Sequence, residues 1–239
     1  MLRTLGMLVT AALVAAAPAA AQTKPPVQVT VGGGWTGVYG SAADNIGNGG
    51  NFTFGLLFHI NDVIGIQGEY GWNGMKKKEL DLPVYPTPFA SGGVSTPFFA
   101  DASMQYGAGN LLVSPHVSGR AEPYFITGLG FYHRPVDITT PAVGYTTICD
   151  PYWYVCYNDL VAVDQVVGSR SSNDFGMNFG GGVNYKLTDH TSIYLEVRYH
   201  YIWGPTVNTT QVNPLSSPST TTPTKANGQF LPITVGFRF

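Results

Sequence analysis

The chain has 239 residues, enough for one domain of ordinary size, and its 12 Lys and Arg residues nearly balance its 14 Asp and Glu residues. Because the net charge is close to zero, there is no electrostatic reason to expect nucleic acid as a partner. Charged residues are 11% of the chain, less than half of the roughly 25% usual in soluble domains. This composition disfavours a soluble protein and suits a surface that contacts lipid.

The first 21 residues have the three parts of a secretory signal peptide. Arg3 supplies a basic start, an apolar stretch runs from Leu5 to Ala17, and a series of small residues ends at Ala21. The stretch is shorter than the roughly 20 apolar residues that cross a bilayer as a helix. We therefore expect a signal peptide over residues 1–21 and a single mature domain over residues 22–239.

The mature domain has the residue pattern of membrane-spanning strands. Nowhere is it apolar for about 20 residues in succession, which excludes a bundle of transmembrane helices. Instead, eight segments alternate apolar with polar or small side chains, as strands of a membrane barrel do. These segments are Val27–Tyr39, Phe52–Ile60, Ile64–Trp72, Ala102–Val113, Pro123–His133, Phe175–Leu187, Ser192–Ile202 and Phe230–Phe239. In the fourth and fifth segments the alternation is blurred, so their inward faces stay open.

Short and long connections alternate between these segments. The short ones lie at Asn61–Asp62, Ser114–Glu122 and Thr188–Thr191, and the long ones at Gly40–Asn51, Asn73–Asp101, Arg134–Asn173 and Trp203–Gly228. Outer-membrane barrels join their strands by short periplasmic turns and longer external loops. We therefore predict an all-β, antiparallel, up-and-down transmembrane β-barrel of about eight strands in the bacterial outer membrane. An extra hairpin arm at Leu160–Val167 leaves ten strands as an alternative.

Charges within the predicted strands indicate which face is inside. The clearest of them, Glu69, Glu196, Arg198 and Arg238, lie opposite the aromatic and branched aliphatic residues of their strands. An arginine that faces lipid near the midplane costs about 2–4 kcal/mol, whereas in the lumen it can pair with a carboxylate. We therefore predict these four charges in the barrel interior, where they form a structural ion-pair network or gate a narrow pore.

The chain ends in an alternating strand, Ile233–Phe239, with Phe237 and Phe239 on its apolar face. This ending, together with the glycine-rich strand and tight turn within Asn178–Tyr201, resembles the small OmpA/OmpX-like, porin-family outer-membrane barrels. The resemblance implies that Phe237 and Phe239 form the signal read by the barrel-assembly machinery. It also implies that membrane lipid and lipopolysaccharide surround the protein. Because no soluble peptidoglycan-binding domain follows, we do not expect the cell-wall anchoring of full-length OmpA.

Cys149 and Cys156 are the only cysteines of the chain, and both fall in the longest predicted external loop. In a protein exported to an oxidising compartment, we expect them to form a disulfide. The bridge either staples the loop or holds Tyr152, Trp153 and Tyr154 as a rigid aromatic tip for an extracellular partner.

These features favour a monomeric, non-enzymatic protein without cofactors or metal ions, whose external loops have a structural or adhesive role. Three alternatives stay open: a narrow pore for small solutes, an outer-leaflet enzyme that modifies lipid A, and a secreted lipocalin-like barrel with reversed faces. His190 and Ser192 would suit the enzyme. However, they fall beside a predicted periplasmic turn, whereas lipid A lies in the outer leaflet.

Overall fold

The computed structural model describes residues 24–80, 97–115, 119–149, 152–153, 156–188, 190–211 and 220–239. The predicted signal peptide and Tyr154 lie outside these residues. Within them, no helix is long and apolar enough to cross a membrane.

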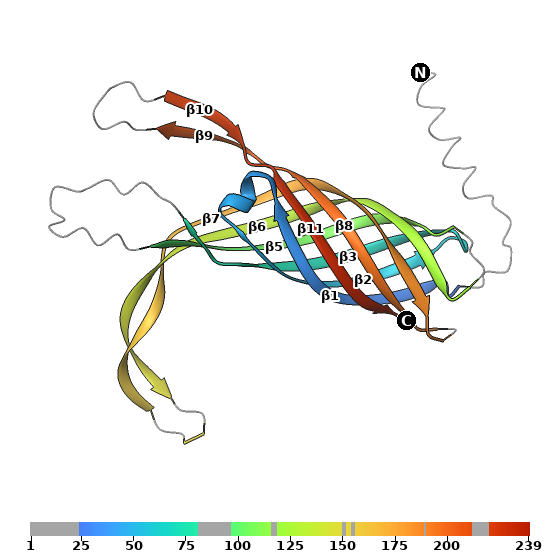
Figure 1. Ribbon diagram of the computed structural model, residues 1–239, viewed down its shortest axis with the longest axis horizontal. Coiled ribbons are helices and arrows are strands. Elements are labelled where there is room, and N and C mark those ends of the chain that lie inside the picture. Colours follow the sequence, from blue (N-terminus) through green and yellow to red (C-terminus); the bar gives the residue numbers. More distant parts are fainter. Residues whose placement is uncertain are drawn as a thin grey trace.

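The described residues form eleven strands and one short 3₁₀ helix, η1 (Figure 1). In chain order these are β1 (Val27–Tyr39), η1 (Gly40–Asp44), β2 (Gly47–His59), β3 (Ile64–Lys76), β4 (Lys78–Leu80), β5 (Phe98–Val113), β6 (Ala121–Cys149), β7 (Cys156–Lys186), β8 (Ser192–Trp203), β9 (Thr206–Gln211), β10 (Thr220–Lys225) and β11 (Gly228–Arg238).

Eight of these strands form a closed antiparallel ring. Each pairs with the next in the order β1, β2, β3, β5, β6, β7, β8, β11, and β11 closes the ring by pairing with β1. Closure leaves no open sheet edge within the ring, where an unpaired backbone group in lipid would cost several kcal/mol. The prediction of an eight-stranded barrel is therefore confirmed. The segment Leu160–Val167 belongs to β7 and adds no further strand to the ring.

The two ends of the barrel differ, as Figure 1 shows. At one end, here called the turn end, lie the connections between β2 and β3 and between β7 and β8, together with the C-terminus. From the opposite end, here called the hairpin end, β6 and β7 project far beyond the ring as a twisted pair of strands. A second hairpin, β9 with β10, also extends from this end.

Both projecting hairpins occupy segments that the sequence predicted as loops. The long loop Arg134–Asn173 consists mostly of continuous β6 and β7, and the loop Trp203–Gly228 contains β9 and β10. Outside the membrane, both faces of a strand can contact water. Alternation of apolar and polar residues is then not required, so the sequence lacks the signal that identifies the barrel strands.

Within the closed ring, side chains mostly alternate between the outer surface and the interior along each strand. Large apolar side chains such as Phe54, Trp72 and Val197 are exposed on the outer surface, whereas the charged side chains of Glu69, Glu196 and Arg198 are buried inside. β5 and β6, whose parity the sequence left open, turn Tyr106 and Tyr132 inward. The interior is therefore a packed mixture of charged and aromatic side chains, as expected for a barrel with room only for side chains.

Candidate functional site

Charged residues from opposite walls of the barrel meet near the middle of its interior. Arg198 on β8 donates two hydrogen bonds to the carboxylate of Glu69 on β3, at 2.7 and 3.1 Å, and a further one to Glu196 on its own strand. Because β3 and β8 lie four places apart in the eight-stranded ring, the pair of Arg198 and Glu69 crosses the whole lumen. The three side chains are only 3–6% exposed.

Arg238 on β11 joins this cluster on the side of the turn end. Its guanidinium packs against the rings of Tyr124 and Tyr194, 4.4 and 4.6 Å from the two ring centroids, in cation–π contacts. Its Nη2 atom is 3.9 Å from Oε2 of Glu196. The structure thus brings all four predicted interior charges into one group, hereafter the ion cluster, which comprises Glu69, Glu196, Arg198 and Arg238.

Tyrosines complete the hydrogen bonding of the buried carboxylates. Tyr106 donates to Glu69 at 2.8 Å, and Tyr124 donates to Glu196 at 3.0 Å. A buried carboxylate loses its hydration, so it needs such donors in addition to an arginine. These tyrosines were not predicted as site residues, because the ambiguous parity of β5 and β6 hid the direction in which they point.

Glycines in the barrel wall make room for these rings. A Cβ atom at Gly71 on β3 would overlap the ring of Tyr106, and one at Gly182 on β7 would lie 2.6 Å from Oη of Tyr124. The glycine-rich pattern of β7 therefore has a packing function, because it lets a bulky side chain lie flat against the neighbouring strand.

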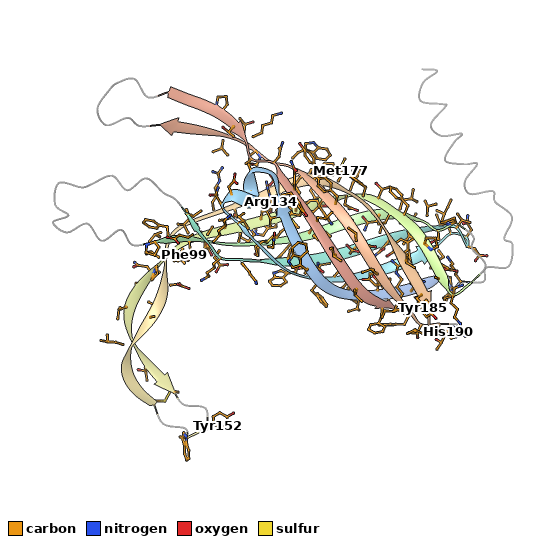
Figure 2. The ribbon with its side chains drawn as sticks, viewed as in Figure 1. Phe99, Arg134, Tyr152, Met177, Tyr185 and His190 are labelled. Carbon is orange, nitrogen blue, oxygen red and sulfur yellow. A yellow bond between two sulfur atoms is a disulfide. The ribbon has the colours of Figure 1, made fainter. Side chains whose placement is uncertain are left out.

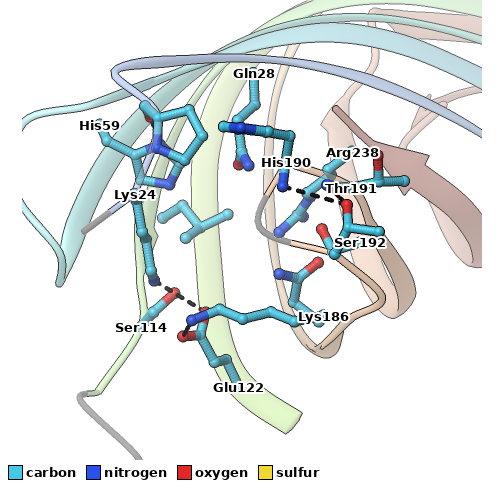
Figure 3. A pocket seen from close by; sticks show the side chains of 14 residues that line it. Lys24, Gln28, His59, Ser114, Glu122, Lys186, His190, Thr191, Ser192 and Arg238 are labelled. Atoms are coloured by element: carbon cyan, nitrogen blue, oxygen red, sulfur yellow. Dashed lines mark hydrogen bonds and ion pairs between the residues drawn. The ribbon is translucent and has the colours of Figure 1, made fainter. Parts of the chain in front are cut away.

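One cavity lies on each side of the ion cluster. At the hairpin end, a cavity of about 420 Å³ is lined by apolar residues that include Met75, Val136 and Phe230, with Arg134 among its polar residues. At the turn end, a smaller cavity of about 170 Å³ is lined mainly by polar side chains (Figure 3). No three His, Cys, Asp or Glu side chains of the described residues are placed to hold a metal ion.

The tip of the long hairpin of β6 and β7 carries exposed aromatic residues. Cys149 and Cys156 form a disulfide that closes this hairpin. Tyr152 and Trp153, which lie between the two cysteines, are 88% and 78% exposed. Figure 2 shows Tyr152 at the far end of the hairpin, well away from the barrel.

The chain matches the family of outer membrane protein beta-barrel domains over residues 7–239. It belongs to this outer-membrane β-barrel family. The membership places the protein in the bacterial outer membrane and agrees with the ring of strands and the apolar outer surface.

A solved structure shows the same barrel fold at low sequence identity. The chain is 15% identical to Neisserial surface protein A, with 90% of this chain and 96% of that chain covered and a TM-score of 0.53. A major outer membrane protein of Thermus thermophilus is 14% identical, with 89% of this chain and 98% of that chain covered and a TM-score of 0.49. The N-terminal barrel domain of Pseudomonas aeruginosa OprF is 9% identical, with 89% of this chain and 97% of that chain covered and a TM-score of 0.40. None of the curated protein sequences matches the chain significantly.

In the topology usual for outer-membrane barrels, short turns face the periplasm and long connections face the exterior. The turn end of this barrel is accordingly the periplasmic end, and the hairpins of the other end extend outside the cell. Phe237 and Phe239 lie at the turn end with exposed side chains, and the backbone of Phe239 pairs with that of Val29 on β1. Their recognition by the assembly machinery stays a prediction.

We expect removal of the disulfide to loosen the tip of the long hairpin while the barrel stays folded. The bridge joins residues 7 positions apart, and closing so short a ring contributes about 2–3 kcal/mol to local stability. In a double Cys149→Ser and Cys156→Ser variant, limited proteolysis should cut near the tip faster than in the wild type. The temperature at which the barrel loses its compact gel migration should be the same for both proteins. A variant barrel that unfolds at a lower temperature than the wild type would contradict the prediction that the disulfide stabilises only the tip of the hairpin.

Proposed function

We propose that this barrel contacts an extracellular partner through the long hairpin of β6 and β7, in a structural or adhesive role. The observation that carries the proposal is the exposure of Tyr152 and Trp153 at a disulfide-closed hairpin tip, which lies far from the barrel (Figure 2). Aromatic residues held on a constrained backbone bury a large area on binding and lose little conformational entropy.

Polar contacts at the base of the hairpin support a defined orientation for it. Lys77 pairs with Asp164 of β7 at 2.5 Å and with Asp101 of β5 at 3.4 Å. The hydrogen bond to Asp164 raises the pKa of the Lys77 ammonium above its usual value. On the inner side, Nε of Arg134 donates to Asp174 at 3.0 Å, which links β6 to β7 below the projecting part. These contacts favour a hairpin that is held in one orientation over a loop that moves freely.

The ion cluster supports a closed barrel and argues against the second candidate function, a narrow pore. The pair of Arg198 and Glu69 spans the lumen, and a passing solute would have to separate two buried charges. In planar bilayers we therefore expect no steady conductance from the purified protein. We also propose that the barrel is a monomer without enzymatic activity, with membrane lipid and lipopolysaccharide around its apolar outer surface.

Display of the protein on a host bacterium tests the adhesive role. Cells with the wild-type barrel should be retained on one or more immobilised extracellular-matrix proteins in larger numbers than cells without it. A double Tyr152→Ala and Trp153→Ala variant should lower this retention about 10-fold or more, since central aromatic residues carry much of the energy of an interface.

A matched control comes from the stem of the same hairpin. Val143 and Val166 are also exposed there, and a double Val143→Ala and Val166→Ala variant should be retained like the wild type. The proposal is wrong if the wild-type barrel adds no retention, or if the tip variant binds as well as the wild type.

A further inference from the structure

The cavity at the turn end contains more positive charge than its acidic residue balances (Figure 3). Its lining has three cations, Lys24, Lys186 and Arg238, and one carboxylate, Glu122. Glu122 is shared, because Nζ of Lys24 lies 3.2 Å and Nζ of Lys186 2.6 Å from its oxygens. The side-chain charges of the ion cluster that includes Arg238 sum to zero, so the side chains of the cavity and the cluster together have one positive charge in excess.

Two buried donors that line this cavity also lack a hydrogen-bond partner. They are Nε of Arg238 and Oγ of Ser192, on residues that are 3% and 4% exposed. The two residues face each other directly in the ladder between β11 and β8, so their side chains enter the interior at the same level. An unpaired buried donor is costly, and more so when it is charged. One buried acceptor without a partner, Oδ1 of Asn184, lines the same cavity. The two unpaired donors therefore still outnumber the unpaired acceptors, and at least one acceptor is missing.

The surroundings of Arg238 restrict how such an acceptor can approach. The rings of Tyr124 and Tyr194 cover its guanidinium, which leaves the N–H groups at its edge. Among the described residues, the nearest carboxylate to Arg238 is that of Glu196, at 3.9 Å, which is beyond hydrogen-bond distance. The edge of the guanidinium and the hydroxyl of Ser192 thus match two oxygens of one anion.

We propose that the turn-end cavity binds a compact oxyanion of the phosphate class, either inorganic phosphate or a soluble phosphate monoester. Arg238 and Ser192 donate hydrogen bonds to its oxygens, and Lys24 and Lys186 supply charge at the rim. The cavity of about 170 Å³ has room for a group of this size. The cavity is lined partly by the turn between β7 and β8, which lies at the periplasmic end, so the anion enters from the periplasm and not from the lipid.

Titration of the full barrel in detergent micelles with inorganic phosphate tests the proposal. We expect saturable binding of one phosphate per barrel, measured by calorimetry at constant ionic strength with chloride as the competing anion. A Ser192→Ala variant should bind phosphate about 5- to 10-fold more weakly, and Lys186→Gln about 3-fold more weakly. Lys225→Gln, at the opposite end of the barrel and exposed, should bind like the wild type.

Arg238→Lys provides a further variant, since it keeps the charge but removes the Nε–H group. We expect weaker phosphate binding, with folding checked by gel migration without boiling. If this variant does not fold, Ser192→Ala and Lys186→Gln decide the question.

Three results would overturn the proposal. Phosphate that binds no better than chloride would mean an adventitious ion only. An equal loss in Lys225→Gln and Lys186→Gln would mean a general effect of net charge. Binding of phosphatidic acid added to the micelles, without binding of inorganic phosphate, would assign the phosphate to a lipid headgroup and not to a soluble anion.

Discussion

Replacement of Arg198 by alanine is expected to lower the free energy of unfolding by about 3–5 kcal/mol, because one partner of a buried ion pair is removed. Arg198 holds Glu69 on the opposite wall and Glu196 on its own strand, and the variant leaves both carboxylates buried without their shared cation. Tyr106 and Tyr124 still donate hydrogen bonds to them. Arg238 stays near Glu196, but one arginine does not balance two carboxylates. Equilibrium unfolding in urea, with the barrel in lipid vesicles, measures the loss.

A second variant shows whether the loss comes from the unpaired charges. Glu69→Gln combined with Arg198→Met removes a cation and an anion together, so we expect it to be more stable than the sum of its single variants predicts. The control is Arg170→Ala, an exposed arginine on the projecting part of β7, which should change stability by less than about 0.5 kcal/mol. An Arg198→Ala barrel as stable as the wild type would show that the ion cluster does not hold the walls together.

Replacement of Val197 by arginine is expected to cost about 2–4 kcal/mol, because its side chain faces lipid near the midplane. Val197 is the neighbour of Arg198 on β8 but points to the outer surface. An arginine at position 198 is therefore expected to stabilise the barrel, whereas an arginine at the adjacent position 197 is expected to destabilise it. The same urea measurement in vesicles determines the difference.

The matched control places the same charge on the part of the barrel strands that lies outside the membrane. Val166 is exposed on the projecting hairpin, so Val166→Arg should leave the barrel stability unchanged. Equal, small effects of Val197→Arg and Val166→Arg would refute the assignment of the outer surface to lipid and would favour a water-soluble barrel.

The sequence by itself determined the barrel strands and most of their faces. Alternation is a local property, since successive side chains of a strand point to opposite sides whatever the strand pairs with. For this reason the prediction that Glu69, Glu196, Arg198 and Arg238 face the interior needed only their neighbours in sequence, and all four are buried in the structure. Chain connections set the antiparallel order, because short turns can join only adjacent antiparallel strands.

Only the tertiary structure decided which interior residues meet. Glu69 and Arg198 are far apart in sequence, and their contact depends on the stagger of the strands around the closed ring, which no single strand encodes. The inward direction of Tyr106 and Tyr124 followed from pairing with neighbouring strands, since small residues blur the pattern of β5 and β6. The projecting hairpin also required the structure. Its residues have no lipid on one face to impose alternation, so only the pairing of β6 with β7 reveals the strands.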